Sequence, residues 1–162
     1  NDVKKLYFPS DQKIAYITQT TLSVFDTQEI VEALEKKFPQ ILAPKKSDIC
    51  YATSNRQISV QEIAKNVDAF FVIGAFNSSN SIRLVETAKR FGCNYSELIE
   101  NIDHFDYQKL NQYKSIGLTA SASAPEKQLN LFIDRVKENF NPEVVDYKED
   151  ENIVFKVPNF LN

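Results

Sequence analysis

The sequence contains no Met and no Trp, only three Gly and two Cys, and a single His. Two Cys are too few for a disulfide framework, so we expect a reducing, cytoplasmic setting. The lone His104 lies in an expected surface segment, which leaves no Ser-His-Asp or Cys-His constellation to build. Because Met is absent, residue 1 is not an unprocessed start, and we expect the chain to be a piece of a longer protein.

Features of membrane and nucleic-acid-binding proteins are also missing. No apolar run approaches the roughly 20 residues that a membrane helix needs, and no apolar core follows the N-terminus as in a signal peptide. A net charge of -3 and the lack of aromatic residues interleaved with basic ones argue against nucleic acid as a partner. The remaining composition, 43% hydrophobic and 25% charged, is that of a globular domain with a core.

One pattern recurs along the chain: a short apolar run, a cluster of hydroxyl and amide side chains, and an amphipathic helix. The apolar runs are residues 14–17, 69–73 and 115–119. Alternating strands and helices predict an α/β fold of parallel-sheet strand–loop–helix units, joined by right-handed crossovers. Loops at the carboxyl ends of parallel strands form the usual binding crevice, and here those loops are rich in hydroxyl groups.

Capping residues predict where the helices begin and end. The first helix should begin after Asp26 or Thr27 and stop at Pro39. Gly92 should close the second helix as the residue after its C-cap. Pro125 should be the first residue of the third helix, because its fixed φ suits that position.

Between the first two units, Ser59 and Glu62 have the spacing of a capping box and predict a further helix. Cys50 then lies in a polar loop before that helix. Weaker strands are expected at residues 95–100 and 153–157.

Two loops have the composition of an anion-binding site, residues 77–80 and 121–123. Each leads into a helix N-terminus, where backbone N–H groups lack partners and the helix dipole is positive. Phosphate or carboxylate can bind there without Lys or Arg. For one such loop, an N-cap or turn is the simpler interpretation. Two such loops at equivalent strand ends favour an anion site, although they do not identify the anion.

The two Cys residues have different contexts. The thiolate of Cys50, in a polar loop, could ligate a metal or act as a nucleophile. A lone Cys is nevertheless more often a small buried hydrophobic residue. Cys93 follows Gly92 at a helix end, and we interpret it as structural or incidental.

A set of motifs is more specific than any single loop. They are residues 18–23, 48–53, 55–57, 77–81 with 83–84, 119–125, and 151–155 with 157–158. In order and spacing they resemble consecutive motifs of the LytB family of iron–sulfur reductases, over nearly the whole chain. One departure is Ser121, which stands where the family's T-A-G-A-S-A-P motif has Gly.

The resemblance implies a fold and an activity. The fold would be a three-lobed trefoil of α/β domains with the site at its centre. The family reduces 4-hydroxy-3-methylbut-2-enyl diphosphate to isopentenyl and dimethylallyl diphosphates at a 4Fe-4S cluster held by three Cys. Ferredoxin or flavodoxin is the expected electron donor.

The resemblance also assigns roles to residues of this sequence. Cys50 would be the third cluster ligand, and Thr20 would lie near the substrate hydroxyl. The diphosphate pocket would comprise Ser78, Ser79, Asn80 and Ser123. The family's other two cluster Cys, its substrate-binding His residues and its catalytic Glu belong to an N-terminal half that this sequence does not include. We therefore expect the isolated chain to hold no stable cluster and to be inactive.

The same comparison suggests domain boundaries. Residues 1–45 would end the middle lobe, 46–142 would form the last lobe, and 143–162 would be a tail returning to the missing N-terminal lobe. Two alternatives remain open from the sequence. One is an α/β module that binds a phosphorylated small molecule without redox chemistry. The other is a structural fragment whose apolar faces dock on a missing half.

Overall fold

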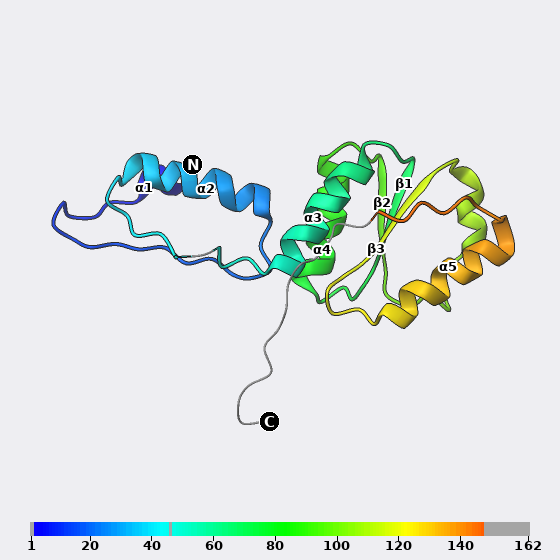
Figure 1. Cartoon of the computed structure of the whole chain (residues 1–162). Helices are drawn as coiled ribbons and strands as arrows, with labels where there is room; N and C mark the ends of the chain where they lie inside the picture. The colour runs from blue at the N-terminus through cyan, green and yellow to red at the C-terminus, as the bar shows by residue number, and fades with distance from the viewer. Residues whose placement is uncertain (1, 46, 148–162) are drawn as a thin grey trace, which may run out of the picture.

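The computed structural model describes residues 2–45 and 47–147, which form a helical segment beside an α/β lobe (Figure 1). In the segment, α1 (Asp2–Lys5) packs against α2 (Val24–Lys37). No helix in these two ranges is both long and apolar enough to cross a membrane.

The lobe is built on a parallel three-stranded sheet in the order β2-β1-β3. Its strands are β1 (Ala69–Ile73), β2 (Tyr95–Ile99) and β3 (Ile116–Ala120). All five residues of β1 are buried, as expected for a central parallel strand with helices on both faces. The predicted α/β class and the predicted strands at 69–73, 95–100 and 115–119 are confirmed.

Helices cover both faces of the sheet (Figure 1). On one face lie α3 (Tyr51–Ala64) and α4 (Ser79–Arg90), and on the other lies α5 (Glu126–Phe140). Successive side chains of β1 alternate between the faces. Phe70 therefore joins the core with α3 and α4, and Phe71 joins the core with α5. Both rings are fully buried, and burial of a side chain this large contributes about 1.5–3 kcal/mol.

An aromatic cluster fixes the connection between β2 and β3 against α5. This connection contains the short helix η1 (Tyr107–Gln112). The Phe105 ring lies 5.5 Å from Phe71 and 5.3 Å from Phe132, centroid to centroid. Such pairs add about 0.5–1.5 kcal/mol each beyond the area they bury. The loop that follows β2 is thereby held close to the sheet edge.

The N-terminal segment differs from the sequence prediction. The run at residues 14–17 forms no strand, and only Ala15 makes an isolated parallel bridge, to Leu42. A strand needs a neighbour along its whole length, and among the described residues this run has only that one bridge. Helix α2 also begins earlier than predicted, because the Ser23 hydroxyl caps it by accepting the N–H of Asp26 at 3.1 Å.

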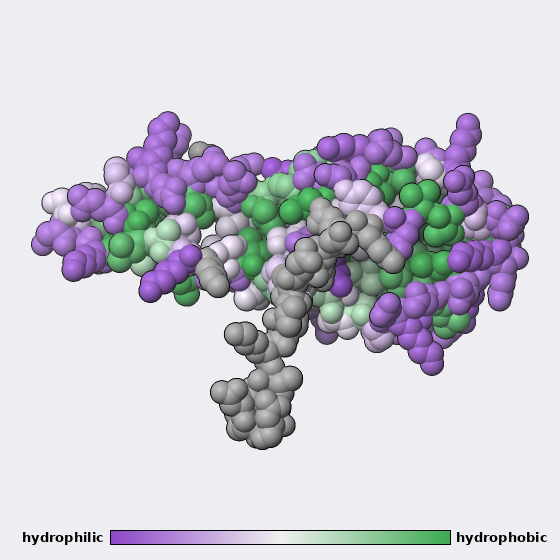
Figure 2. All heavy atoms as spheres, viewed as in Figure 1, coloured by the Kyte–Doolittle hydropathy of each residue, from purple (hydrophilic) through white to green (hydrophobic). Residues whose placement is uncertain are grey.

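Apolar side chains are exposed on this segment, and hydrophobic atoms are visible on its surface in Figure 2. Tyr7 is 86% exposed and Ile17 is 87% exposed. Leu42 is 58% exposed. Contiguous apolar patches on a protein surface commonly pack against other protein.

The helix before β1 begins much earlier than the capping box predicted. Helix α3 starts at Tyr51, so Ser59 lies in its interior, where the hydroxyl donates to the Asn55 carbonyl at 3.0 Å. The capping-box prediction is wrong, and Cys50 is the N-cap residue of α3 rather than part of a long loop.

The other helix ends agree closely with prediction. Gly92 follows the C-cap of α4 with a φ of 106°, a conformation that L side chains rarely adopt. Pro125 is the N-cap of α5, one position earlier than predicted. The strand predicted at 153–157 and the motif at 151–158 lie outside the described residues, as does most of the predicted tail. The domain boundaries remain predictions.

Gly117 offers a test of the core beneath α3. A Cβ at this position would lie 2.5 Å from the Phe70 ring and 3.1 Å from Ile63. Gly117→Ala should lower the free energy of unfolding by about 1–3 kcal/mol, the usual cost of overpacking. Urea denaturation measures the loss. Because Phe70→Leu removes the obstructing ring atoms, the added methyl should cost less in that background. An equally large cost there would contradict the packing described.

Candidate anion site and thiol ligand

The candidate site lies at the carboxyl edge of the sheet, where β1 and β3 end side by side. Ile73 is the last residue of β1, and its carbonyl accepts the N–H of Ser121 at 2.8 Å. This bond continues the pairing of β1 with β3 one residue beyond Ala120. The loop after β3 therefore starts directly beside the loop after β1.

The loop after β1 leads into the N-terminus of α4. Ser78 is the N-cap, and its hydroxyl accepts the N–H of Ser81 at 3.3 Å. Asn80 is only 5% exposed. Within residues 2–45 and 47–147, both polar atoms of its amide and the Ser81 hydroxyl are buried without a hydrogen-bond partner. Buried polar groups normally have hydrogen-bond partners, so these free donors and acceptors make this helix end a candidate site for a polar ligand.

The loop after β3 supplies the facing side of the site. Ser121 is 1% exposed, and its hydroxyl lies 3.4 Å from that of Ser123. Ser79 and Ser123 themselves are exposed. The structure thus gathers the predicted anion-binding hydroxyl and amide groups at two adjoining loops.

Gly74 allows these two loops to approach each other. A Cβ built on Gly74 would lie 2.3 Å from the Ser81 hydroxyl oxygen and 3.0 Å from that of Ser121. Any larger residue would push the start of α4 away from the loop after β3. The glycine at this position is required by the close approach, and its φ is not in the left-handed region.

A second contact joins Thr20 to Cys50. The Cys50 N–H donates to the Thr20 carbonyl at 3.0 Å, and both residues are exposed. The Thr18 N–H donates to the Asp48 carboxylate at 2.8 Å. Two hydrogen bonds therefore hold the loop carrying Thr20 beside the N-terminus of α3. A small cavity of about 200 Å³, lined in part by Thr18, Asp48 and Ile49, adjoins this contact.

Arg56 links the Cys50 helix to the sheet edge. Its Nε donates to the Ala120 carbonyl at 3.1 Å, and one terminal nitrogen donates to the Ala52 carbonyl at 2.9 Å. The first half of α3 is thereby tied to the end of β3, so Cys50 and the anion loops belong to the same edge of the lobe.

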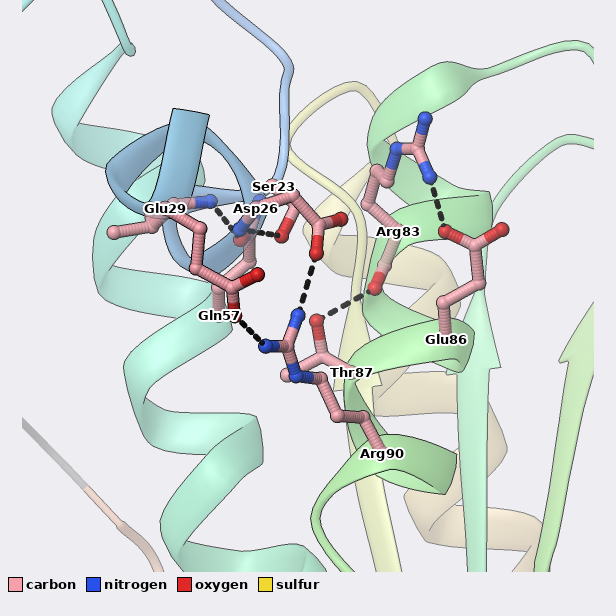
Figure 3. A network of polar contacts seen from close by, with 9 residues as sticks. Ser23, Asp26, Glu29, Gln57, Arg83, Glu86, Thr87 and Arg90 are labelled. Atoms are coloured by element: carbon pink, nitrogen blue, oxygen red, sulfur yellow. Dashed lines mark hydrogen bonds and ion pairs between the residues drawn. The ribbon is translucent and has the colours of Figure 1, made fainter. Parts of the chain in front are cut away.

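Figure 3 shows the contacts between the α2 segment and the lobe. Gln57 of α3 bonds to the backbone on both sides of Ser23, and Arg90 of α4 pairs with Asp26 at 2.5 Å and Glu29 at 2.8 Å. Sequence reasoning assigned roles to neither Gln57 nor Arg56. The available signal was their place in the motif at residues 55–57, directly after the Cys50 loop.

The clearest pKa shifts lie away from this edge. Burial raises the pKa of Glu97, but hydrogen bonds from Lys109 at 2.5 Å and from Tyr95 outweigh it, so its pKa is lowered overall. Backbone N–H groups of Ser115 and Lys114 lower the pKa of Asp68. Asp68 holds the starts of β1 and β3 together through these bonds, and Glu97 joins β2 to Lys109 of η1.

Cys50 is the one thiol available for metal ligation. Its sulfur is exposed at the positive end of a 14-residue helix, which favours an anionic ligand atom. Cys93 is buried, and its thiol lies 3.1 Å from the Tyr95 carbonyl, which confirms its structural role. In the described ranges, no group of three or more His, Cys, Asp or Glu residues could hold a metal ion. Cys50 fits one ligand position of a larger set.

Fold and site together define a parallel α/β lobe with two loops rich in hydroxyl and amide groups at one sheet edge and an exposed thiol at a helix N-terminus. The LytB protein family matches residues 1–137. This chain belongs to the LytB family.

Curated relatives share this family. The chain is 46% identical over 162 residues to the 4-hydroxy-3-methylbut-2-enyl diphosphate reductase of Ruegeria pomeroyi, covering 99% of this chain and 51% of that protein. It is 47% identical to the reductase of the same name from Roseobacter denitrificans, with the same coverage. The chain spans about half the length of the curated relatives it matches.

Solved structures of the same family resemble this chain. The E-1-hydroxy-2-methyl-but-2-enyl-4-diphosphate reductase from Plasmodium falciparum matches with a TM-score of 0.86 and 36% identity, over 99% of this chain and 51% of that one. A second solved reductase, the terminal enzyme of the non-mevalonate pathway, matches with a TM-score of 0.53 and 28% identity, over 78% and 44% of the two chains. These likenesses support the prediction that the lobe is one unit of a trefoil.

Gly74 provides a test of the anion edge. Gly74→Ala should weaken the binding of inorganic diphosphate at least about tenfold, the value of one hydrogen bond to a charged group, because the methyl separates Ser81 from Ser121. Isothermal titration calorimetry measures the affinity. Gly92→Ala is the matched control: no atom lies within 4 Å of its Cβ, and it should lower stability without changing affinity. If Gly74→Ala left the affinity for diphosphate unchanged, this edge would not be the anion site.

Proposed function

We propose that the protein encoded by the full-length gene containing this chain reduces 4-hydroxy-3-methylbut-2-enyl diphosphate. The products would be isopentenyl and dimethylallyl diphosphates, and the reaction would belong to the non-mevalonate route of isoprenoid synthesis. The observation that carries the proposal is the buried, unpartnered amide of Asn80 at the start of α4, beside the Ser121 loop. Family membership and the names of the relatives support the identity of the substrate.

In this proposal the diphosphate binds at the carboxyl edge through neutral donors. The residues that would contact it are Ser78, Ser79, Asn80 and Ser123. Unpaired N–H groups in the first turn of α4 and the positive end of its dipole add to the attraction. Such an arrangement binds phosphate oxygens without a Lys or Arg side chain.

Cys50 would be one ligand of a 4Fe-4S cluster, with its other protein ligands supplied by residues outside this chain. Thiolate sulfur is the usual protein ligand of such clusters, and the exposed thiol at the N-terminus of α3 suits that role. When bound, the cluster supplies electrons to the substrate. The net reaction breaks the C–O bond of the hydroxyl, consumes two electrons and two protons, and releases water.

Thr20 would hydrogen-bond the substrate hydroxyl. The Thr20 carbonyl accepts the N–H of Cys50, and this bond holds Thr20 next to the proposed cluster ligand. Within this chain, the proposed binding roles fall on two groups of residues. The two Ser loops hold the diphosphate end, and the contact between Thr20 and Cys50 serves the hydroxyl end.

Partners of the full-length protein follow from the same proposal. Ferredoxin or flavodoxin would donate the electrons, in the cytoplasm. The exposed apolar groups of Tyr7, Ile17 and Leu42 would pack against the part of the protein that precedes this chain in its relatives.

The alternative is an α/β module that binds a phosphorylated small molecule without redox chemistry. Its support is that the anion edge is complete within the described residues, whereas Cys50 is a lone candidate ligand. A colourless protein that binds phosphorylated compounds and reduces none of them would favour this alternative.

Replacing each Cys with Ser in turn tests which thiol binds the cluster. After anaerobic reconstitution of the full-length protein, Cys50→Ser should lose cluster absorbance and substrate turnover. The loss should exceed the roughly 10–100-fold effect typical of changes outside the ligand shell. The visible spectrum and a product assay provide the measurement.

Cys93→Ser is the matched control, because its thiol is buried between backbone groups and should leave the cluster intact. The 162-residue chain prepared alone should show neither cluster absorbance nor turnover. A stable cluster in Cys50→Ser, or in the chain alone, would refute the ligand assignment.

Asn80→Ala tests the diphosphate pocket. Losing one hydrogen bond to a charged group costs about 1.5–3 kcal/mol, which corresponds to a rise in KM of roughly 10–150-fold. Steady-state kinetics on the full-length protein measures it. Lys89→Ala changes an exposed side chain in the last turn of α4, at the opposite end of the helix from the anion loops, and should leave KM unaltered. Equal effects from the two changes would count against a specific role for Asn80.

A further inference from the structure

Gln57 makes an unusual pair of contacts for a buried polar side chain. It is fully buried in α3. Its Oε1 accepts the N–H of Val24 at 2.9 Å, and its Nε2 donates to the carbonyl of Leu22 at 3.0 Å. One amide thus satisfies a donor and an acceptor on either side of Ser23, and Figure 3 shows Gln57 close to Ser23.

These contacts complete the cap of α2. Val24 is the first residue of that helix, so its N–H has no partner within the helix. The Ser23 hydroxyl is already used, since it accepts the N–H of Asp26. Gln57 therefore caps α2 from a different helix, and a side chain with only donors or only acceptors could not replace it.

The same segment is held at a second point by Cys50. Cys50 and Gln57 are about two turns apart, which places them on one face of α3. The Cys50 N–H binds the Thr20 carbonyl, and Gln57 binds Leu22 and Val24. Residues 20–24 therefore run along α3 between two fixed points.

We propose that Gln57 is a positioning residue for the reaction. By holding Leu22 and Val24, it fixes the loop that carries Thr20 against the helix that carries Cys50. The Thr20 hydroxyl then keeps its place relative to the proposed ligand sulfur. The proposal rests on the proposed function for its catalytic consequence. The clamp, by which we mean the two hydrogen bonds of Gln57 to Leu22 and Val24, is a feature of the structure itself.

A double-mutant cycle on the reconstituted full-length protein tests this role. Gln57→Leu keeps the side-chain size and removes both hydrogen bonds, and should lower kcat roughly 10–100-fold through misplacement of Thr20. Thr20→Val should lower kcat to a similar extent. If Gln57 acts through Thr20, adding Gln57→Leu to Thr20→Val should lower kcat by less than about twofold.

Two controls separate positioning from stability. Val60→Ala removes buried volume from the same helix, on the side facing the sheet core. It should lower the melting temperature without changing kcat of the folded fraction. Gln57→Met is a second apolar variant, with an unbranched side chain of similar length, for use if Gln57→Leu folds poorly. It also removes both hydrogen bonds and should lower kcat to the same extent. Cluster absorbance should stay unchanged in both Gln57 variants.

Amide hydrogen exchange supplies a readout that does not depend on turnover. Gln57→Leu should accelerate exchange at residues 20–26 and leave β1 protected, whereas Val60→Ala should not single out that segment. If the unaltered protein shows no turnover, the proposed function fails and exchange still decides whether the clamp exists. Unchanged exchange at residues 20–26, or fully multiplicative effects of Gln57→Leu and Thr20→Val on kcat, would overturn the proposal.

Discussion

Burial of β1 on both faces is the constraint on which the rest of the lobe depends. A five-residue strand with no exposed side chain can exist only between two layers of helices and two neighbouring strands. Phe70 and Phe71 divide its side chains between two separate cores, so α3 and α4 are anchored independently of α5. The carboxyl end of this strand fixes where the loop after β1 begins, and the bond from Ser121 to Ile73 places the loop after β3 beside it.

At that end, the chain uses small residues where larger ones would fill the space. Gly74, Ser81 and Ser121 crowd together, and next to Ser81 the Asn80 amide is buried with no partner in the part of the chain that the structure describes. An unpaired buried amide costs the free energy of its lost hydrogen bonds to water, about 1–3 kcal/mol. A polar ligand that bonds to this amide would recover part of that free energy.

The sequence predicted this lobe well because its signals are local. The apolar run at 69–73 and the glycine at 92 each determine an element boundary through burial or backbone conformation. The failures have a different origin. The run at 14–17 forms only one bridge, because strand formation depends on partners far away in the chain. Ser59 was mistaken for a cap because its hydroxyl bonds within α3 equally well. The roles of Gln57 and Arg56 depend on contacts across more than 30 residues of sequence, which no spacing rule reports.

The different access to the two thiols has a practical consequence. Cys50 is exposed, while Cys93 is 2% exposed beneath the end of α4. Reagents that modify free thiols in water will therefore treat the folded chain as a protein with one reactive cysteine. A spectroscopic label can be attached at the N-terminus of α3 without altering any residue. The second thiol becomes accessible when the lobe unfolds, so the number of labelled sites per chain reports directly on the integrity of the core.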